Sequence, residues 1–297
     1  MQVIVVNNLT GNRTTNCQVD TNDRALNYGD GCFTTMYAQN GRVLLLDAHV
    51  QRLYRDAVRL GFLLTHEELS KYVTEHLSSI ISDSQQPCVI KLLLSRGSGG
   101  RGYALPDEPR YKLIISITPI DAFTILNHYE DVALCLGVAS IRLSHQPQLA
   151  GIKHLNRLEQ IMAKRELATI TDCDDLLMLA PNEHVIEATS ANLFFYKDKQ
   201  WYTPALDNCG VAGVMREALI AYFKQRNVTL HVGHYTLAQV AQADCLCLTN
   251  AIRVIQPVKA LAGVVSSHYQ TDIYAELLHD FYAFICSDVY QLKVSVL

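Results

Sequence analysis

The chain has 297 residues, of which 49% are hydrophobic and 18% charged, with a formal net charge of −4. This length is about twice that at which a single domain usually stops growing, so two domains are expected, and the composition excludes a disordered chain. No basic block stands out and no apolar run approaches the roughly 18 residues of a membrane helix, so neither nucleic acid nor a membrane is expected as a partner.

The beginning of the chain is predicted to form a first strand. Residues 1–7 are too short an apolar stretch for a signal peptide and lack a basic start. The nine cysteines contain no Cys-x-x-Cys pair, and the closest two, Cys245 and Cys247, lie in an apolar run. Buried free thiols in a reducing cytoplasm, rather than disulfides or a metal site, are therefore expected.

The next elements are a hairpin and a helix. Asn40-Gly41 supplies the positive φ values of a two-residue turn, which predicts a hairpin over residues 32–46. Apolar residues then recur at helical spacing, with Asp47 expected to cap this helix and Gly61 to end it.

Residues 65–81 are predicted to form a second helix, because Thr65-His66-Glu67-Glu68 is a capping box. Two apolar segments, residues 88–94 and 111–117, are predicted strands, and a glycine-rich loop joins them.

The rest of the chain again mixes strands and helices. Strands are predicted over 131–139, 175–180, 192–196 and 245–249, helices over 156–168, 213–226 and 271–291, and a turn over 181–184. Residues 119–130 have weak periodicity and are the candidate linker. The sequence thus predicts an α+β or α/β protein of two domains, an N-terminal α/β domain over 1–118 and a C-terminal domain over 131–297.

The glycine-rich loop, Arg96-Gly97-Ser98-Gly99-Gly100-Arg101-Gly102-Tyr103, does not have the residue order of a phosphate-binding loop. One interpretation is a flexible connection between antiparallel strands. The other is a mobile loop that presents Arg96 and Arg101 to an anionic substrate, since arginine pairs well with carboxylates.

Three other residues have both a structural and a chemical interpretation. Arg52 lies three residues after His49 at the edge of a buried stripe, where a partly buried arginine needs an anionic partner. Lys153 is either a surface charge or a Schiff-base lysine. Glu187, which small residues follow, is either a cap or surface charge or the carboxylate of a site for a planar group. None of the three is decisive alone.

A longer pattern resolves these alternatives. Glu187-Ala-Thr-Ser-Ala-Asn192-Leu-Phe, Tyr202-Thr-Pro204 and Val211-Ala-Gly213-Val214-Met-Arg216 together resemble the signature of the class-IV aminotransferase family, the fold type IV pyridoxal-phosphate enzymes. Trp201 stands where the family usually has an aliphatic residue or Phe. Segments 23–35, 49–53, 95–103 and 151–160 look like the aminodeoxychorismate lyases of this family, and the likeness spans residues 23 to about 257.

The resemblance implies a smaller N-terminal and a larger C-terminal domain, with pyridoxal 5′-phosphate at their interface. It assigns Lys153 to the cofactor aldehyde, Glu187 to the pyridine nitrogen and Arg52 to the phosphate. The cofactor-binding residues that it implies are Arg52, Lys153, Glu187, Asn192, Val214, Met215, Thr249 and Asn250. No metal is implied.

The resemblance also implies the reaction, which is conversion of 4-amino-4-deoxychorismate into 4-aminobenzoate and pyruvate in folate biosynthesis. Lys153 is expected to move the protons, and the hydroxyl of Thr34 or Thr35, with Thr35 preferred, to lie near the leaving group. The implied substrate residues are Tyr28, Phe33, Arg96, Arg101 and Tyr103. In relatives, Arg101 and Tyr103 reach across from the other subunit, so a homodimer is expected.

Two alternatives remain open from the sequence. One is a D-amino-acid or branched-chain aminotransferase on the same fold, although Leu158 replaces the Tyr that branched-chain enzymes carry five residues after the lysine. The other is a non-catalytic phosphate- or nucleotide-binding protein built around the glycine-rich loop, which Lys153 and Glu187 argue against.

Overall fold

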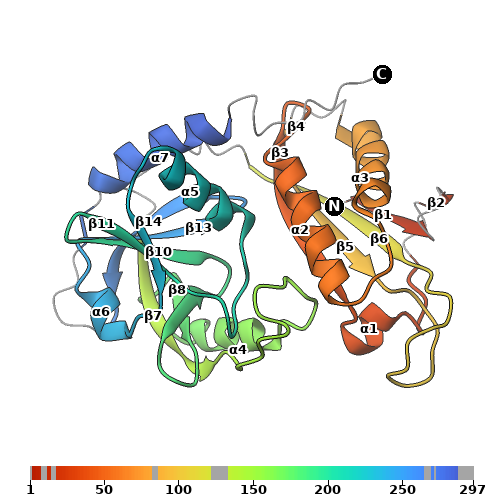
Figure 1. The fold of residues 1–297 in the computed structure, drawn as a ribbon, viewed down its shortest axis with the longest axis horizontal. Coiled ribbons are helices and arrows are strands. Elements are labelled where there is room, and N and C mark those ends of the chain that lie inside the picture. Colours follow the sequence, from red (N-terminus) through yellow and green to blue (C-terminus); the bar gives the residue numbers. More distant parts are fainter. Residues whose placement is uncertain are drawn as a thin grey trace. The chain divides into compact units, whose positions relative to one another are not determined.

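The computed structural model describes residues 2–7, 12–14, 18–81, 86–121, 133–263, 269–270 and 272–286. It divides into two compact units (Figure 1). The first comprises Met1–Phe123, Lys153–Asn156 and Cys286–Leu297, and the second comprises Thr124–Ile152 and Arg157–Ile285. Most of the predicted linker lies outside the described residues, so the domain boundaries stay a prediction.

The first unit is a six-stranded antiparallel sheet in the order β2-β1-β6-β5-β3-β4. Its strands are β1 (Gln2–Asn7), β2 (Asn12–Thr14), β3 (Gly31–Gln39), β4 (Arg42–Val43), β5 (Cys88–Ser95) and β6 (Lys112–Pro119). Its helices are α1 (Arg24–Tyr28), α2 (Leu46–Arg59) and α3 (His66–Ile81).

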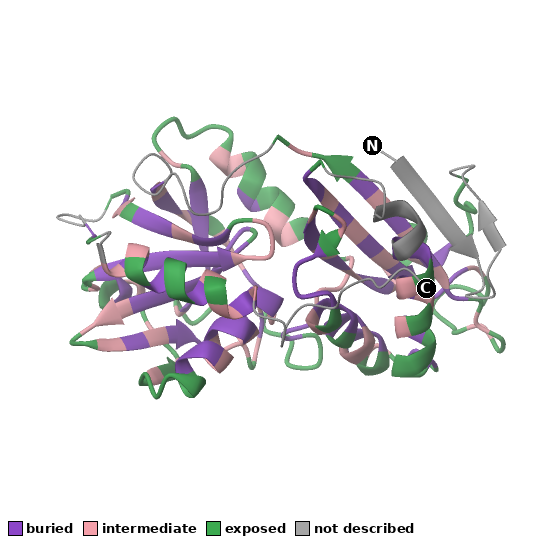
Figure 2. Cartoon of the chain, turned by 90° about the horizontal axis from the view of Figure 1, so that it is seen from above, coloured by how far each residue is buried: buried purple, intermediate pink, exposed green. Residues whose placement is uncertain are grey.

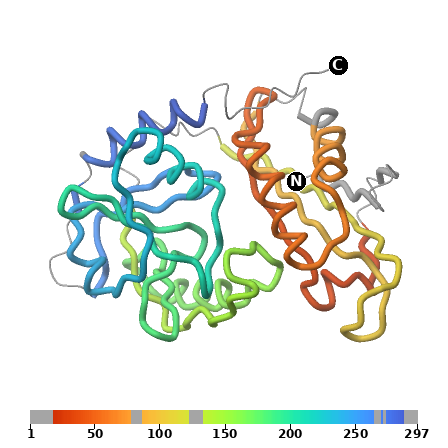
Figure 3. The backbone as a smooth tube through the Cα atoms, in the orientation of Figure 1, coloured from red at the N-terminus to blue at the C-terminus, as the bar shows by residue number. Residues whose placement is uncertain are grey.

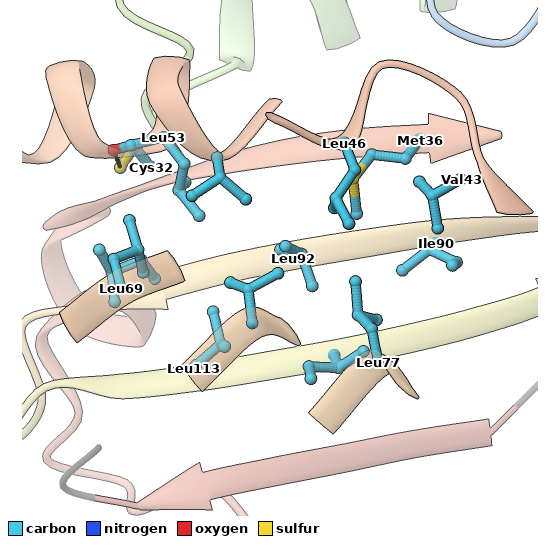
Figure 4. Packing of buried hydrophobic residues seen from close by; sticks show 14 of the residues in the cluster. Cys32, Met36, Val43, Leu46, Leu53, Leu69, Leu77, Ile90, Leu92 and Leu113 are labelled. Atoms are coloured by element: carbon cyan, nitrogen blue, oxygen red, sulfur yellow. Dashed lines mark hydrogen bonds between the residues drawn. The ribbon is translucent and has the colours of Figure 1, made fainter. Parts of the chain in front are cut away.

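The core of this unit lies between the sheet and the helices α2 and α3. Alternate residues of β5, Ile90 and Leu92 among them, are fully buried and pack in one cluster with Leu53 of α2 and Leu69 of α3 (Figure 4). The residues between them on β5 are half-buried and belong to the opposite face of the sheet. The sheet therefore has one face covered by helices and one face available for other contacts.

The predicted local structure of this unit is largely confirmed. Asn40 (φ 52°) and Gly41 (φ 70°) form the predicted turn, and Thr65 and Glu68 exchange the two hydrogen bonds of a capping box. Gly61, with φ 78°, ends α2 as predicted.

The expectation that Asp47 caps α2 is wrong. The N-cap residue is Leu45, in a left-handed conformation (φ 56°) and without a side-chain cap, and Asp47 lies in the first turn. The helix therefore begins at Leu46, earlier than the side-chain pattern indicates. The burial of Leu45 in the core accompanies its unusual backbone conformation.

The second unit is an eight-stranded mixed sheet in the order β12-β11-β10-β13-β14-β7-β8-β9. Its strands are β7 (Leu134–Arg142), β8 (Asp175–Leu179), β9 (Val185–Ala188), β10 (Asn192–Lys197), β11 (Gln200–Pro204), β12 (Leu230–Gly233), β13 (Cys245–Asn250) and β14 (Val254–Leu261). Its helices are α4 (Leu158–Leu167), α5 (Val214–Gln225), α6 (Leu237–Ala241) and α7 (Asp272–Ile285).

An additional pairing between β9 and β10 closes the strands from β10 to β9 into a barrel-like ring. Alternate residues, including Leu193, Leu246 and Val258, are buried in one core cluster. On the other face of β10, Phe194 packs against Phe223 of α5. Burial in this unit is concentrated on the strands (Figure 2).

The predicted elements of this unit are confirmed over the described residues, with ends that differ by a few residues. The predicted last helix ends at Ile285, and residues 287–291 of that prediction lie outside the described part. The short strands β9, β11 and β12, the longer strand β14 and the short helix α6 were not predicted. Among the described residues, no helix is both long and apolar enough to cross a membrane.

Candidate active site

The backbone of Lys153 is fixed against the first unit. Phe33 N–H donates to the Lys153 carbonyl (3.0 Å), and Leu155 N–H donates to the Gly31 carbonyl (3.1 Å). These bonds pair residues 153–155 with the first half of β3, whereas β4 pairs only with the last residues of β3. On the other side, Lys153 N–H donates to Oδ2 of Asp56 in α2 (3.0 Å). A short segment held from two sides gives the lysine a defined backbone position.

The Lys153 side chain lies against an aromatic ring. Its Nζ is 4.6 Å from the centre of the Phe33 ring, and Nζ of Lys91 is 4.7 Å from the same centre. Lys91 is paired with Thr35 in the register of β3 and β5, so Phe33, Thr35 and Lys91 share the face away from α2 and α3. Lys91 was not among the site residues predicted from the sequence, although strand alternation places it on this face once the register is known.

One face of helix α2 carries polar residues that are buried in the first unit. His49, Arg52 and Asp56 follow at helical spacing and are all at least 96% buried. Nη2 of Arg52 donates to Oγ1 of Thr34 (2.6 Å), and the same oxygen is 2.6 Å from Nδ1 of His49. One partner of Arg52 is thus a neutral hydroxyl, whereas the sequence predicted an anionic partner.

Burial on this face of α2 shifts the pKa values of His49 and Asp56. Burial lowers the pKa of His49 well below its ordinary value, and the positive charges of Arg52 and Lys153 lower it further, so the imidazole is neutral. Burial raises the pKa of Asp56, against the Lys153 N–H group and the charge of Arg52, which act to lower it.

The two adjacent threonines of β3 lie on opposite faces of the sheet. Thr34 is fully buried between the sheet and α2, where its hydroxyl is engaged by Arg52. Thr35 is half-buried on the face that carries Phe33, whose ring contacts Lys153. This geometry supports Thr35 rather than Thr34 as the hydroxyl beside the reacting atoms.

The glycine-rich loop between β5 and β6 is held in place by Arg24 of α1, beside which it lies (Figures 1 and 3). The Arg24 guanidinium donates, at 2.9–3.4 Å, to the carbonyls of Gly99, Gly102, Tyr103 and Ala104. A Cβ at Gly100, where φ is 74°, would overlap the carbonyl of Ala104. The loop is therefore an ordered structure that requires its glycines.

Arg96 is an internal anchor of this loop. It is 3% exposed, and its guanidinium donates to Asp30 (2.8 Å) and to the carbonyls of Leu60 (2.6 Å) and Gly61 (3.1 Å). Its donors thus connect the loop to the end of α2. These contacts give Arg96 a structural role, and we do not retain it as a substrate-binding residue.

Asp30 is shared by two buried arginines. Its Oδ2 lies 2.7 Å from Nε of Arg24 and 2.8 Å from Nε of Arg96. Burial acts to raise the pKa of Asp30, but the hydrogen bonds and charges of the two arginines outweigh it and hold this pKa below its ordinary value. The carboxylate therefore stays ionised and offsets one of the two buried arginine charges at the base of the loop.

The other predicted substrate residues lie at the surface of the first unit. Tyr28 and Tyr103 contact each other edge to face, with ring centres 5.5 Å apart, and Arg101 is exposed on the same loop as Tyr103. Tyr103 is 87% exposed. Exposed aromatic and arginine side chains on an ordered loop are available to bind a ligand or a second chain.

In the second unit, three buried polar residues form a row across neighbouring strands. Asn192 of β10 is paired in register with Glu187 of β9 and with Thr249 of β13, so the three side chains share one face. Oε2 of Glu187 accepts from Nδ2 of Asn192 (3.3 Å) and from Val211 N–H (2.9 Å). The row lies where the barrel-like ring closes.

The N-terminus of α5 lies next to this row. Its N-cap, Gly213, has no side-chain cap, and a Cβ there would overlap Oδ1 of Asn192. The buried hydroxyl of Thr249 has no hydrogen-bond partner among the described residues. An uncapped helix N-terminus, which includes Val214 and Met215, and an unpaired hydroxyl together fit a bound phosphate group.

Asn250 differs from its neighbour Thr249. Its Oδ1 accepts from the N–H groups of Ile252 (3.0 Å) and Arg253 (2.8 Å), so the side chain builds the turn after β13. Val254 follows this turn with φ 61°, which is strained for a β-branched residue. We therefore assign the Asn250 side chain to the turn that shapes the segment and leave ligand contact to Thr249.

Comparison with known proteins gives a consistent result. The model of the amino-transferase class IV family matches residues 31–261. An aminodeoxychorismate lyase of Vibrio harveyi is 34% identical over 82% of this chain and 88% of its own. The crystal structure of 4-amino-4-deoxychorismate lyase from Pseudomonas aeruginosa superposes with a TM-score of 0.79 at 34% identity, over 89% of this chain and 94% of that one.

The fold is shared more widely than the sequence. The branched-chain aminotransferase of Thermoproteus uzoniensis has a TM-score of 0.82 at 21% identity, over 99% of this chain and all of its own. At this identity the likeness shows the fold alone. The family model matches most of the chain, and the identity to the lyases is higher. This chain therefore belongs to the class IV aminotransferase family of pyridoxal-phosphate enzymes.

Proposed function

We propose that this protein is a pyridoxal-phosphate-dependent lyase that converts 4-amino-4-deoxychorismate into 4-aminobenzoate and pyruvate, a step of folate biosynthesis. The observation that carries the proposal is the 34% identity to an aminodeoxychorismate lyase over most of both chains. The anchored Lys153 and the buried Glu187 support it, because they are the groups that this cofactor chemistry needs.

The residues present fit the cofactor. When bound, pyridoxal 5′-phosphate supplies an electron sink for the substrate's carbanionic electrons. Lys153 would hold its aldehyde carbon, and Glu187 its pyridine nitrogen. Arg52 would hold the phosphate, as would the N–H groups of Val214 and Met215 and the Thr249 hydroxyl. Asn192 would orient Glu187, to which it donates a hydrogen bond.

The chain's own side chains would then move protons and orient the substrate. Nζ of Lys153 accepts the proton from C4 of the substrate and returns a proton to the departing enolpyruvate oxygen. The Thr35 hydroxyl, which shares a face of β3 with Phe33, would act on the side of the leaving group. Arg101 and Tyr103 bind a substrate carboxylate. Loss of pyruvate leaves an aromatic ring, which makes the reaction strongly favourable.

The first experiment is product detection. Purified protein with pyridoxal phosphate is incubated with 4-amino-4-deoxychorismate, pyruvate is followed with lactate dehydrogenase, and 4-aminobenzoate is followed by its fluorescence. We expect both products in equal amounts. Transamination of D-alanine or a branched-chain amino acid without pyruvate release from aminodeoxychorismate would establish the aminotransferase alternative instead.

Glu187→Gln tests the carboxylate of the second unit. Gln keeps the size and can still accept from Val211 N–H, but it carries no charge to favour a protonated pyridine nitrogen. We expect kcat to fall by about 10²–10⁴-fold, while cofactor absorbance remains. The control is Glu183→Gln, because Glu183 is exposed and pairs only with Arg142 among the contacts described; kcat should be unchanged.

We also propose a homodimer in the cytoplasm. The exposure of Arg101 and Tyr103 supports the dimer, since these side chains are free to reach a second copy of the chain. The eight cysteines in the described part of the chain are free thiols, which supports a reducing compartment. Sedimentation at the mass of one chain would contradict the dimer.

A further inference from the structure

We propose that Thr34 and His49 are positioning residues for Arg52, which they hold in the orientation that receives the cofactor phosphate. The three side chains meet at one atom, Oγ1 of Thr34, which is 2.6 Å from both Nη2 of Arg52 and Nδ1 of His49. The inference rests on the proposed function, in which Arg52 binds the phosphate, and it adds two residues that touch neither cofactor nor substrate.

The donors and acceptors of this cluster are mutually compatible at the Thr34 oxygen. A guanidinium can only donate, so Oγ1 of Thr34 accepts from Arg52. The Thr34 hydroxyl donates its one proton to Nδ1 when the histidine proton lies on Nε2, and it accepts from Nδ1 in the other neutral tautomer; in both cases the same oxygen joins His49 to Arg52. A protonated His49 would instead place two positive donors on the same oxygen.

The surroundings of the cluster make this arrangement rigid. Thr34, His49 and Arg52 are 0%, 1% and 4% exposed. On β3, Thr34 stands between Cys32 and Met36, which point into the same apolar core. An unpaired hydroxyl or imidazole there would lose hydrogen bonds that water cannot replace. Each member of the cluster therefore restricts the rotamers of the other two.

A comparison within the chain shows what is unusual about Thr34. Thr203 is also fully buried on a strand, but its hydroxyl donates to the backbone carbonyl of Leu193 (2.8 Å). That bond satisfies the hydroxyl of Thr203 and links its strand to the backbone of β10. The Thr34 hydroxyl instead joins two side chains of α2, one of which is a cation. The Thr34 hydroxyl therefore orients the Arg52 side chain, whereas the Thr203 hydroxyl stabilises the backbone of a neighbouring strand.

The test separates phosphate binding from all other cofactor contacts. The apoprotein is titrated with pyridoxal 5′-phosphate and, separately, with pyridoxal, which lacks the phosphate, and binding is followed by absorbance. For Thr34→Val we expect about tenfold weaker binding of pyridoxal phosphate, the scale of one hydrogen bond to a charged group, and unchanged binding of pyridoxal. Thr34→Ser, which keeps the hydroxyl, should restore the affinity.

His49 gives the same contrast without a change at Thr34. In His49→Asn the amide oxygen can stand in for Nδ1, whereas in His49→Gln the amide lies where Nε2 was and cannot meet Thr34. We expect His49→Asn to retain the preference for pyridoxal phosphate and His49→Gln to lose it by a similar factor. This pair keeps the test decisive if Thr34→Val does not fold.

Two reference variants define the outcomes. Thr203→Val removes a buried hydroxyl outside the site and should lower thermal stability without changing the preference for the phosphorylated ligand. Arg52→Gln should abolish the preference. If Arg52→Gln abolishes it but Thr34→Val and His49→Gln do not change it, the positioning role is overturned and the proposed role of Arg52 stands. If Arg52→Gln leaves the preference unchanged, both are overturned.

Discussion

Lys153→Ala is expected to abolish both the absorbance band of covalently bound cofactor and the release of pyruvate. An alanine has no amine to bond with the cofactor aldehyde or to move the proton at C4, and the loss of such a group costs at least about 10²–10⁴-fold in rate. The backbone contacts of residue 153 with Phe33 and Asp56 do not involve the side chain, so the fold is expected to survive. Absorbance and the coupled assay measure the two effects.

The matched control is Lys91→Ala. Nζ of Lys91 lies at nearly the same distance from the Phe33 ring as Nζ of Lys153, 4.7 Å against 4.6 Å, so the two variants remove similar charges from the same face. Only Lys153→Ala should lose the absorbance band and the covalent trapping of cofactor by borohydride. Trapping that survives in Lys153→Ala and disappears in Lys91→Ala would show that the wrong lysine has been assigned.

Asp30→Asn is expected to lower the free energy of unfolding by about 3 kcal/mol, because it leaves two buried arginines without their shared counter-charge. Asp30 contacts Arg24 at 2.7 Å and Arg96 at 2.8 Å, and both arginines are at least 96% buried. Urea unfolding measures the effect. Glu183→Gln, which breaks an exposed pair with Arg142, should cost less than about 1 kcal/mol, and equal losses in the two variants would contradict the role of burial.

The pH dependence provides an independent check of the same network. The arginines depress the pKa of Asp30 in the folded state, so the ionised carboxylate stabilises the fold above its unfolded pKa of about 3.9. This contribution is lost as pH falls below that value and through the folded pKa. The difference in stability between wild type and Asp30→Asn should therefore be constant near neutral pH and shrink below about pH 4.

The sequence predicted those parts of the fold that local chemistry determines. Asn40-Gly41, Thr65 with Glu68, and Gly61 each adopt the conformation that their residue types favour. The start of α2 was predicted at Asp47 because side chains that cap helices are easy to recognise. The structure instead has Leu45 at the N-cap, buried and with a left-handed backbone that its residue type does not favour, so no local pattern indicates it.

For the candidate site too, the sequence predicted which residues carry the chemistry but not how the fold pairs their charges. The family resemblance over several segments pointed to Lys153, Glu187 and Arg52, but it contains no information on which charges of the folded chain neutralise one another. From the sequence, Arg96 was a candidate ligand for an anionic substrate. In the structure its guanidinium is buried and bonded to Asp30, which is 66 residues away in the chain and also binds Arg24, six residues away. Thr34 and Thr35 are neighbours in a predicted strand and must face opposite sides of it. Only the packing of α2 on the sheet shows that Thr34 is the buried one.

The pairing of Lys153–Leu155 with β3 also bears on how the protein forms during synthesis. The first half of the outer edge of β3 receives its hydrogen bonds from residues that follow 120 positions later in the chain. A nascent chain that ends before this segment leaves that edge unpaired, and exposed strand edges promote association with other chains. Protection of this edge of β3 from aggregation thus waits for synthesis of the segment that contains Lys153, the lysine proposed to carry the reactive amine.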